Sequence, residues 1–104
     1  MQEEVVKKET RVRSAIVSGI DHSKINSRRE LLGMSYAYLA DRAEISQARM
    51  STLSRGLSKW RVTDIRNVLD ILDMEPRDVI QDPVILKYYL RELQLVEEAN
   101  KQHG

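Results

Sequence analysis

Apolar residues recur at intervals of three and four along most of the chain, which is the spacing of a helix with one buried face. One such series follows residue 62 and consists of Ile65, Val68, Leu69 and Leu72. A second series lies near the C-terminus and consists of Leu86, Leu90 and Leu93, with Tyr89 and Val96 beside it. Helix-forming residues are abundant, whereas the chain has only 4 Gly and 2 Pro. The pattern therefore predicts an all-α fold.

Short polar residues before the apolar series, and glycines after them, predict where the helices begin and end. Proline supports two of the starts, because it is tolerated in the first turn of a helix. The predicted helices run to Leu32 from a cap at Asp21 or Ser23, over 36–43 after Ser35, over 47–55 after Ser46, onward from a cap at Thr63, from Pro76 to Ile80, and from Pro83 to about Asn100. Residues 57–62 are predicted to form a loop.

The 104 residues suffice for one domain with a single modest core. We expect a short helix or ordered arm in 1–20, a central domain in 21–81 and an added C-terminal helix in 82–104. The chain has no cysteine, which excludes a disulfide framework and a thiolate metal site. No apolar run approaches the ~18 residues of a membrane span, and the charged N-terminus is unlike a signal peptide. These features predict a cytoplasmic protein without membrane contact.

The net charge of +1 conceals an uneven distribution of charges along the chain. Residues 22–62 carry eight Lys and Arg against three acids, a net +5, whereas residues 63–104 carry five against nine, a net −4. A basic segment inside a nearly neutral chain is typical of a surface that binds a polyanion. An excess of this size also occurs on a surface that contacts only solvent.

Two short predicted helices, separated by three residues, share the stretch SYAYLADRAEISQARMSTLSRG. This arrangement is typical of a helix-turn-helix, in which one edge of each helix is buried and the second helix projects outward. The apolar positions that the motif requires are Leu39, Ala43, Ile45, Met50 and Leu53. Ala40 stands where the two helices would cross most closely, so that only a small side chain fits there.

The longer stretch INSRRELLGMSYAYLADRAEISQARMSTLSRG, with the apolar helix after it, resembles the Cro/repressor-type (Xre-like) helix-turn-helix domain of phage and bacterial regulators. The resemblance spans roughly Ile20–Ile80 and implies a five-helix, lambda-repressor-like domain. Three positions depart from the pattern of the family. Glu44 occupies the turn position usually taken by Gly, and Tyr36 replaces a Gln that often contacts a phosphate. Ser54 replaces a Glu, so that Arg29 lacks its usual partner.

The resemblance also implies which residues contact DNA. The residues expected to read base edges in the major groove are Gln47, Ala48, Ser51 and Thr52. The residues expected to contact phosphates are Ser35, Tyr36, Ser46, Arg49, Arg55, Ser58, Lys59 and Arg61. Glutamine can make two hydrogen bonds to adenine, and the methyl groups of Ala and Thr can pack against thymine. The alternative is that these residues form an ordinary polar surface. Trp60 either anchors its loop against the following helix or lies on the sugar–phosphate backbone.

A single helix-turn-helix contacts few bases, so two subunits related by a two-fold axis are the usual solution. The C-terminal helix can supply a contact between subunits, or else pack on its own domain. The residues expected at such a contact are Leu86, Tyr89, Leu90, Leu93 and Val96.

We therefore expect a sequence-specific regulator that binds a double-stranded DNA operator, most simply a homodimeric repressor of phage or mobile-element type. Two alternatives remain: an antitoxin that represses its own operon and binds a toxin, and a helical protein-interaction module without DNA binding. If the chain is a repressor, we expect a separate protein antagonist to relieve repression. His22 and His103 have no accompanying carboxylate cluster, so the sequence indicates no catalytic residue, metal site or cofactor, and we do not expect an enzyme.

Overall fold

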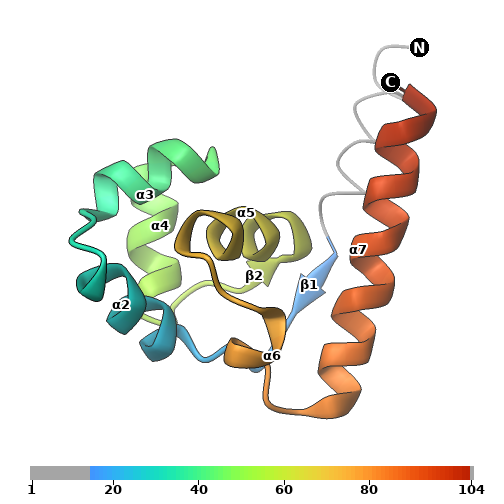
Figure 1. Cartoon of the computed structure of the whole chain (residues 1–104), viewed down its shortest axis with the longest axis horizontal. Coiled ribbons are helices and arrows are strands. Elements are labelled where there is room, and N and C mark those ends of the chain that lie inside the picture. The colour runs from blue at the N-terminus through green and yellow to red at the C-terminus, as the bar shows by residue number, and fades with distance from the viewer. Residues whose placement is uncertain (1–14, 104) are drawn as a thin grey trace.

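The structure is a computed structural model and describes residues 15–103. It is mostly helical, with one small antiparallel sheet (Figure 1). The elements in chain order are β1 (Ile16–Val17), α2 (His22–Leu31), α3 (Tyr36–Ala43), α4 (Gln47–Ser54), β2 (Trp60–Arg61), α5 (Val62–Leu72), α6 (Pro76–Val79) and α7 (Pro83–His103). None of the helices within this described part of the chain is long and apolar enough to cross a membrane.

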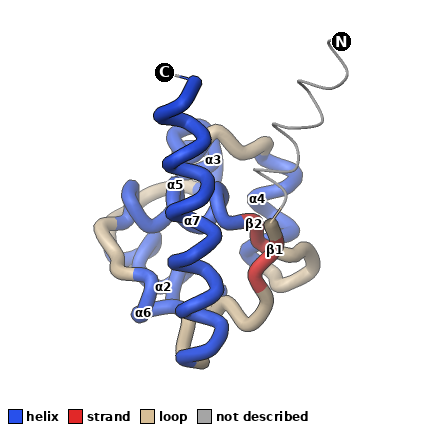
Figure 2. Tube along the Cα trace, turned by 90° about the vertical axis from the view of Figure 1, so that its right-hand side faces the viewer, coloured by secondary structure: helices blue, strands red, loops and turns tan. Residues whose placement is uncertain are grey.

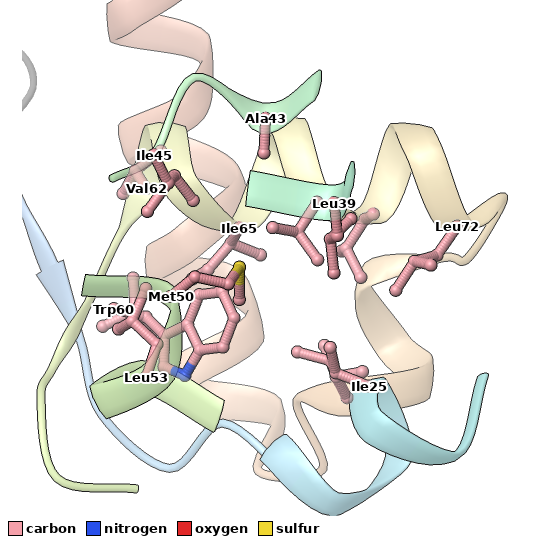
Figure 3. Close-up of a cluster of buried hydrophobic side chains, with 14 of the residues drawn as sticks. Ile25, Leu39, Ala43, Ile45, Met50, Leu53, Trp60, Val62, Ile65 and Leu72 are labelled. Carbon is pink, nitrogen blue, oxygen red and sulfur yellow. The ribbon is translucent and has the colours of Figure 1, made fainter. Parts of the chain in front are cut away.

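Helix α5 lies at the centre of the molecule and packs against α2, α3 and α7 (Figure 1). Its predicted apolar face is confirmed, because Ile65, Val68, Leu69 and Leu72 are all buried. Side chains from other elements pack around this face, among them Ile25 from α2 and Leu39 from α3 (Figure 3). The core is therefore built around one amphipathic helix, as its spacing predicted.

The predicted helix starts are mostly confirmed by their capping hydrogen bonds. Asp21, Ser35 and Ser46 each accept a backbone N–H three residues further on, at 3.3, 3.1 and 3.1 Å. The cap predicted at Thr63 is wrong. Helix α5 begins at Val62, and the Asp64 carboxylate reaches back to accept the N–H of Arg61 at 3.2 Å. An acceptor inside the first turn makes a cap at residue 63 unnecessary.

The two-stranded sheet was not predicted. Ile16 pairs with Arg61 and Val17 with Trp60, and the N–H of Val62 donates to the carbonyl of Ala15 at 3.0 Å (Figure 2). Within the predicted loop at 57–62, residues 60–61 therefore form a strand and Val62 begins α5. The helix alternative for 1–20 is wrong for residues 15–20, because β-branched side chains here find a partner strand distant in sequence. The remainder of that prediction lies outside the described residues.

Trp60 fills the space between this sheet and the helices. Its indole ring is buried beside Met50 and Leu53 of α4 (Figure 3). Trp60 therefore anchors its loop, as predicted, but the neighbours shown belong to α4 and not to the following helix. The alternative of a contact with the DNA backbone is wrong, because the ring is not available at the surface.

Helix α7 begins as predicted, with the Asp82 carboxylate accepting the N–H of Val84 at 2.8 Å, and it extends to His103. Two residues of its predicted intersubunit set, Tyr89 and Val96, are buried in the core of their own domain. Burial and the nearby charge of Asp70 raise the pKa of Tyr89 to about 12. This part of α7 therefore packs on α5, and neither residue is accessible to a second copy.

Candidate nucleic-acid interface

Helices α3 and α4 pack against each other and are joined by residues 44–46. The close crossing expected at Ala40 is consistent with its complete burial, and Met50 and Leu53 of α4 are also fully buried. The N–H of Ile45 donates to the carbonyl of Ala40 at 2.9 Å and fixes the turn. One side of α4 is therefore held firmly in the core, and its opposite side is presented outward.

The turn between these helices requires a left-handed backbone at Glu44. Its φ is 59° and its ψ is 40°. The carbonyl of Ala43 next to it accepts a hydrogen bond from the Asn67 amide of α5 at 3.1 Å. A residue with a side chain pays about 1–2 kcal/mol for this conformation, so the turn stores strain that a glycine would release.

We expect Glu44→Gly to raise the free energy of unfolding by about 1 kcal/mol, because relief of strain exceeds the flexibility that glycine adds to the unfolded chain. Urea denaturation measures this change. Asp73→Gly is the matched control, since Asp73 also has a positive φ, 54°, but follows the far end of α5. Both variants should gain stability. A destabilised Glu44→Gly would show that the carboxylate contributes more than the strain costs.

Three of the four expected base-reading residues lie on the outer side of α4. Gln47, Ala48 and Ser51 are exposed, and we call them the α4 face. Thr52 differs from the expectation, because it is half-buried. Its hydroxyl donates to the carbonyl of Arg49 at 2.9 Å and accepts from the Ser58 hydroxyl at 2.8 Å. Thr52 and Ser58 therefore join the end of α4 to the loop after it.

Arg49 also has an internal role that differs from the expected phosphate contact. Its guanidinium lies 2.6 Å from the Asp64 carboxylate and 3.0 Å from the carbonyl of Lys59. Both charged side chains are largely shielded from solvent. The pair ties α4 to the start of α5 and holds the intervening loop, so that Arg49 is already satisfied by protein groups.

The remaining cations flank the α4 face. Arg55, Lys59 and Arg61 are all exposed, and the Arg55 guanidinium approaches the carbonyl of Ser51 at 3.3 Å. Ser35 and Ser46, which are exposed, cap the two helices. Because the first backbone N–H groups of a helix have no intrahelical acceptor, these two starts add to the positive potential.

Arg29 finds a partner that sequence reasoning missed. Its guanidinium carbon lies 3.8 Å from the centre of the Tyr36 ring, and one N–H donates to the carbonyl of Met34. A cation over an aromatic face is stabilised by the charge distribution of the ring. Tyr36 thus supplies the partner of Arg29 in place of an acidic side chain.

Asn26 completes this network. Its side-chain oxygen accepts the Tyr36 hydroxyl at 2.9 Å, and its amide donates to the carbonyl of Ser54 at 2.9 Å. One side chain of α2 therefore fixes the start of α3 and the end of α4. The sequence contained one signal for this role. Asparagine is unfavourable inside a helix, so that an Asn within the predicted helix indicates a side chain whose amide makes a hydrogen bond elsewhere.

A hollow of about 420 Å³ lies between the turn after α3 and the first turn of α5. Its charged lining consists of Arg49, Arg61, Arg66, Glu44 and Asp64. Three cations against two acids leave this surface slightly positive. The hollow adjoins the start of α4, because Ser46 and Arg49 also line it.

Within residues 15–103 no three His, Cys, Asp or Glu side chains gather as metal ligands would. Comparison of the chain with protein-family models, curated proteins and solved structures finds no match. The candidate site therefore rests on its own geometry: an exposed helix face of small polar groups, flanked by cations and held from behind by the core.

Proposed function

We propose that this chain is a sequence-specific regulator of transcription that binds double-stranded DNA through a Cro/repressor-type helix-turn-helix formed by α3 and α4. The observation that carries the proposal is the α4 face, Gln47, Ala48 and Ser51, exposed on a helix whose other side is fully buried. A helix held in this way is rigid and can enter the major groove, which is about 12 Å wide.

The chemistry of the α4 face suits base edges. Gln47 offers a donor and an acceptor for adenine, Ala48 a methyl for thymine, and Ser51 a hydroxyl for several bases. Helix α4 contains no Asp or Glu. A carboxylate would be repelled by the phosphates on both sides of the groove, so that its absence fits a DNA-facing surface.

The flanking cations supply affinity without sequence choice. We assign phosphate contacts to Arg55, Lys59 and Arg61, and to the backbone N–H groups at the starts of α3 and α4. Arg49 is left out of this set, because Asp64 and the loop carbonyl already satisfy it. Thr52 is left out of the base-reading set, because its hydroxyl is already bonded to Arg49 and to Ser58 of the loop that it holds.

Such a protein represses transcription by occupying an operator that overlaps promoter elements. One α4 face spans few base pairs, so the proposal includes a homodimer in which two faces read adjacent half-sites about one helical turn apart. A protein-interaction module is the second candidate. Leu31 and Val84 favour it, because each apolar side chain is 75% exposed.

We expect Lys59→Ala to weaken binding to any duplex and to flatten the slope of log affinity against log salt by about one ion per contact. Fluorescence anisotropy of a labelled duplex, titrated at several salt concentrations, measures both quantities. Lys101→Ala is the matched control, because Lys101 is an exposed lysine near the end of α7. It should leave both quantities unchanged.

Two outcomes would count against the proposal. A wild-type protein that binds no duplex at low salt would favour the interaction module. A Lys59→Ala effect restricted to one sequence would show that Lys59 reads bases, against the role assigned to it.

A further inference from the structure

The hollow between the turn after α3 and the first turn of α5 has the size of a small-molecule site. Its volume of about 420 Å³ falls within the range of about 300–1,000 Å³ that is usual for such sites. Ala43 and Ile45, labelled in Figure 3, line it and are buried in the core. The hydrogen bond from Asn67 to Ala43 and the ion pair of Arg49 with Asp64 join its walls. The hollow is therefore formed before any ligand enters.

Two of the three arginines at the hollow can bind a ligand. Arg49 is already held by Asp64. Arg61 is exposed and forms no ion pair within the described part of the chain, and Arg66 lies 3.9 Å from the Glu97 carboxylate, too far for a strong hydrogen bond. A phosphate monoester carries nearly two negative charges at neutral pH and three acceptor oxygens, so that it can engage both guanidinium groups.

The other polar groups of the hollow favour a small ligand over the backbone of DNA. Glu44 and Asp64 place two carboxylates in the lining. A backbone phosphate has no hydrogen to donate and would be repelled by them, whereas hydroxyl groups can donate to both. The side chains of Thr63 and Asn67 can donate and accept hydrogen bonds at the same surface. Arginines together with carboxylates therefore suit a molecule that combines one phosphate with several hydroxyls.

We propose that this hollow binds a phosphorylated sugar and that the bound sugar phosphate weakens the grip of the protein on its operator. The second part rests on the proposed function, in which Arg61 contacts a phosphate of DNA. A sugar phosphate would occupy Arg61 and place negative charge beside Ser46, where α4 begins. The two ligands then oppose each other, and duplex DNA must weaken sugar-phosphate binding by the same factor.

The site itself is tested without DNA, by following the backbone amide signals of the full chain in NMR titrations at constant ionic strength. We expect ribose-5-phosphate to shift the signals of the lining residues saturably, ribose to have no effect, and inorganic phosphate to bind more weakly because it lacks the sugar hydroxyls. Arg66→Gln should raise the dissociation constant for ribose-5-phosphate at least about tenfold, because a charged hydrogen bond is lost. Arg77→Gln is the matched control, since Arg77 is an exposed arginine on α6 outside the hollow.

The effect on DNA binding is tested separately, by anisotropy of a labelled duplex at one salt concentration. Saturating ribose-5-phosphate should raise the dissociation constant of the wild type for the duplex at least about fivefold. Arg66→Gln should bind the duplex like the wild type when no sugar phosphate is present, and it should lose this response. Circular dichroism should show native helix content in both arginine variants, because both side chains reach solvent.

Four results would overturn the inference. The absence of saturable shifts would remove the site, and equal shifts in Arg66→Gln would reduce the effect to general attraction of an anion. A loss of duplex affinity in Arg66→Gln would show that the hollow holds a backbone phosphate of DNA. Unchanged duplex affinity with ribose-5-phosphate bound would remove the opposition between the two ligands. A chain that binds ribose-5-phosphate but no duplex would refute the proposed function alone, and DNA binding without ribose-5-phosphate binding would refute the site alone.

Discussion

We expect Leu53→Ala to lower the free energy of unfolding by about 2–5 kcal/mol, because it leaves a cavity in the core that the rigid surroundings fill only partly. Leu53 is fully buried, beside Met50 and Trp60 (Figure 3). Domains of this size are stable by only about 5–15 kcal/mol in total. The loss is therefore a large share of the whole, and urea denaturation followed by circular dichroism measures it.

Leu57→Ala is the matched control for this substitution. Leu57 follows α4 closely in sequence but is 67% exposed, so its removal should change stability by no more than about 0.5 kcal/mol. Equal losses in the two variants would contradict the assignment of Leu53 to the core and of α4 to a rigid position on it.

We expect Gln47→Ala to weaken binding to the preferred duplex by about 1–3 kcal/mol for each half-site, because it removes the side chain able to make two hydrogen bonds to one base. Binding to a scrambled duplex should change much less, since phosphate contacts carry the affinity there. Because Gln47 is exposed, the stability of the protein should be nearly unchanged. Anisotropy titrations of both duplexes at one salt concentration provide the measurement.

Gln94→Ala serves as the control for the loss of a glutamine. Gln94 is exposed on α7, where its amide lies 3.3 Å from Glu98 of the next turn. This variant should bind both duplexes like the wild type. An equal loss of affinity for both duplexes in Gln47→Ala would mean that Gln47 does not read bases, and the α4 face would lose its proposed role.

Local sequence signals predicted most of the helical structure. The caps at Ser35 and Ser46, the apolar series of α5 and the proline start of α7 each depend on residues within one or two turns. The resemblance placed Glu44 at a turn position usually taken by Gly, and the structure shows that its backbone there is left-handed. These signals can be read from the sequence because the residues that determine each helix start or buried face lie within or next to that helix.

Several features that sequence reasoning missed join residues far apart. The pairing of β1 with β2 and the ion pair of Arg49 with Asp64 depend on tertiary approach, which no local pattern encodes. Asn26, which links α3 and α4, is 10 residues from Tyr36 and 28 from the carbonyl that it binds.

The same limit applied within the candidate site. Gln47, Ala48 and Ser51 were placed outward correctly, because helical spacing sets them opposite Met50 and Leu53. Helical spacing did not predict which residues of α4 find partners within the protein. In the structure, Thr52 and Arg49 hydrogen-bond to protein groups and do not point freely outward.

The central claim, that the α4 face selects a DNA sequence, is tested most directly by exposing the full chain to a pool of random duplexes and sequencing those that stay bound. The account predicts enrichment of one motif with two related half-sites, centred about one helical turn apart. A pool that remains random after repeated selection at low salt would contradict it.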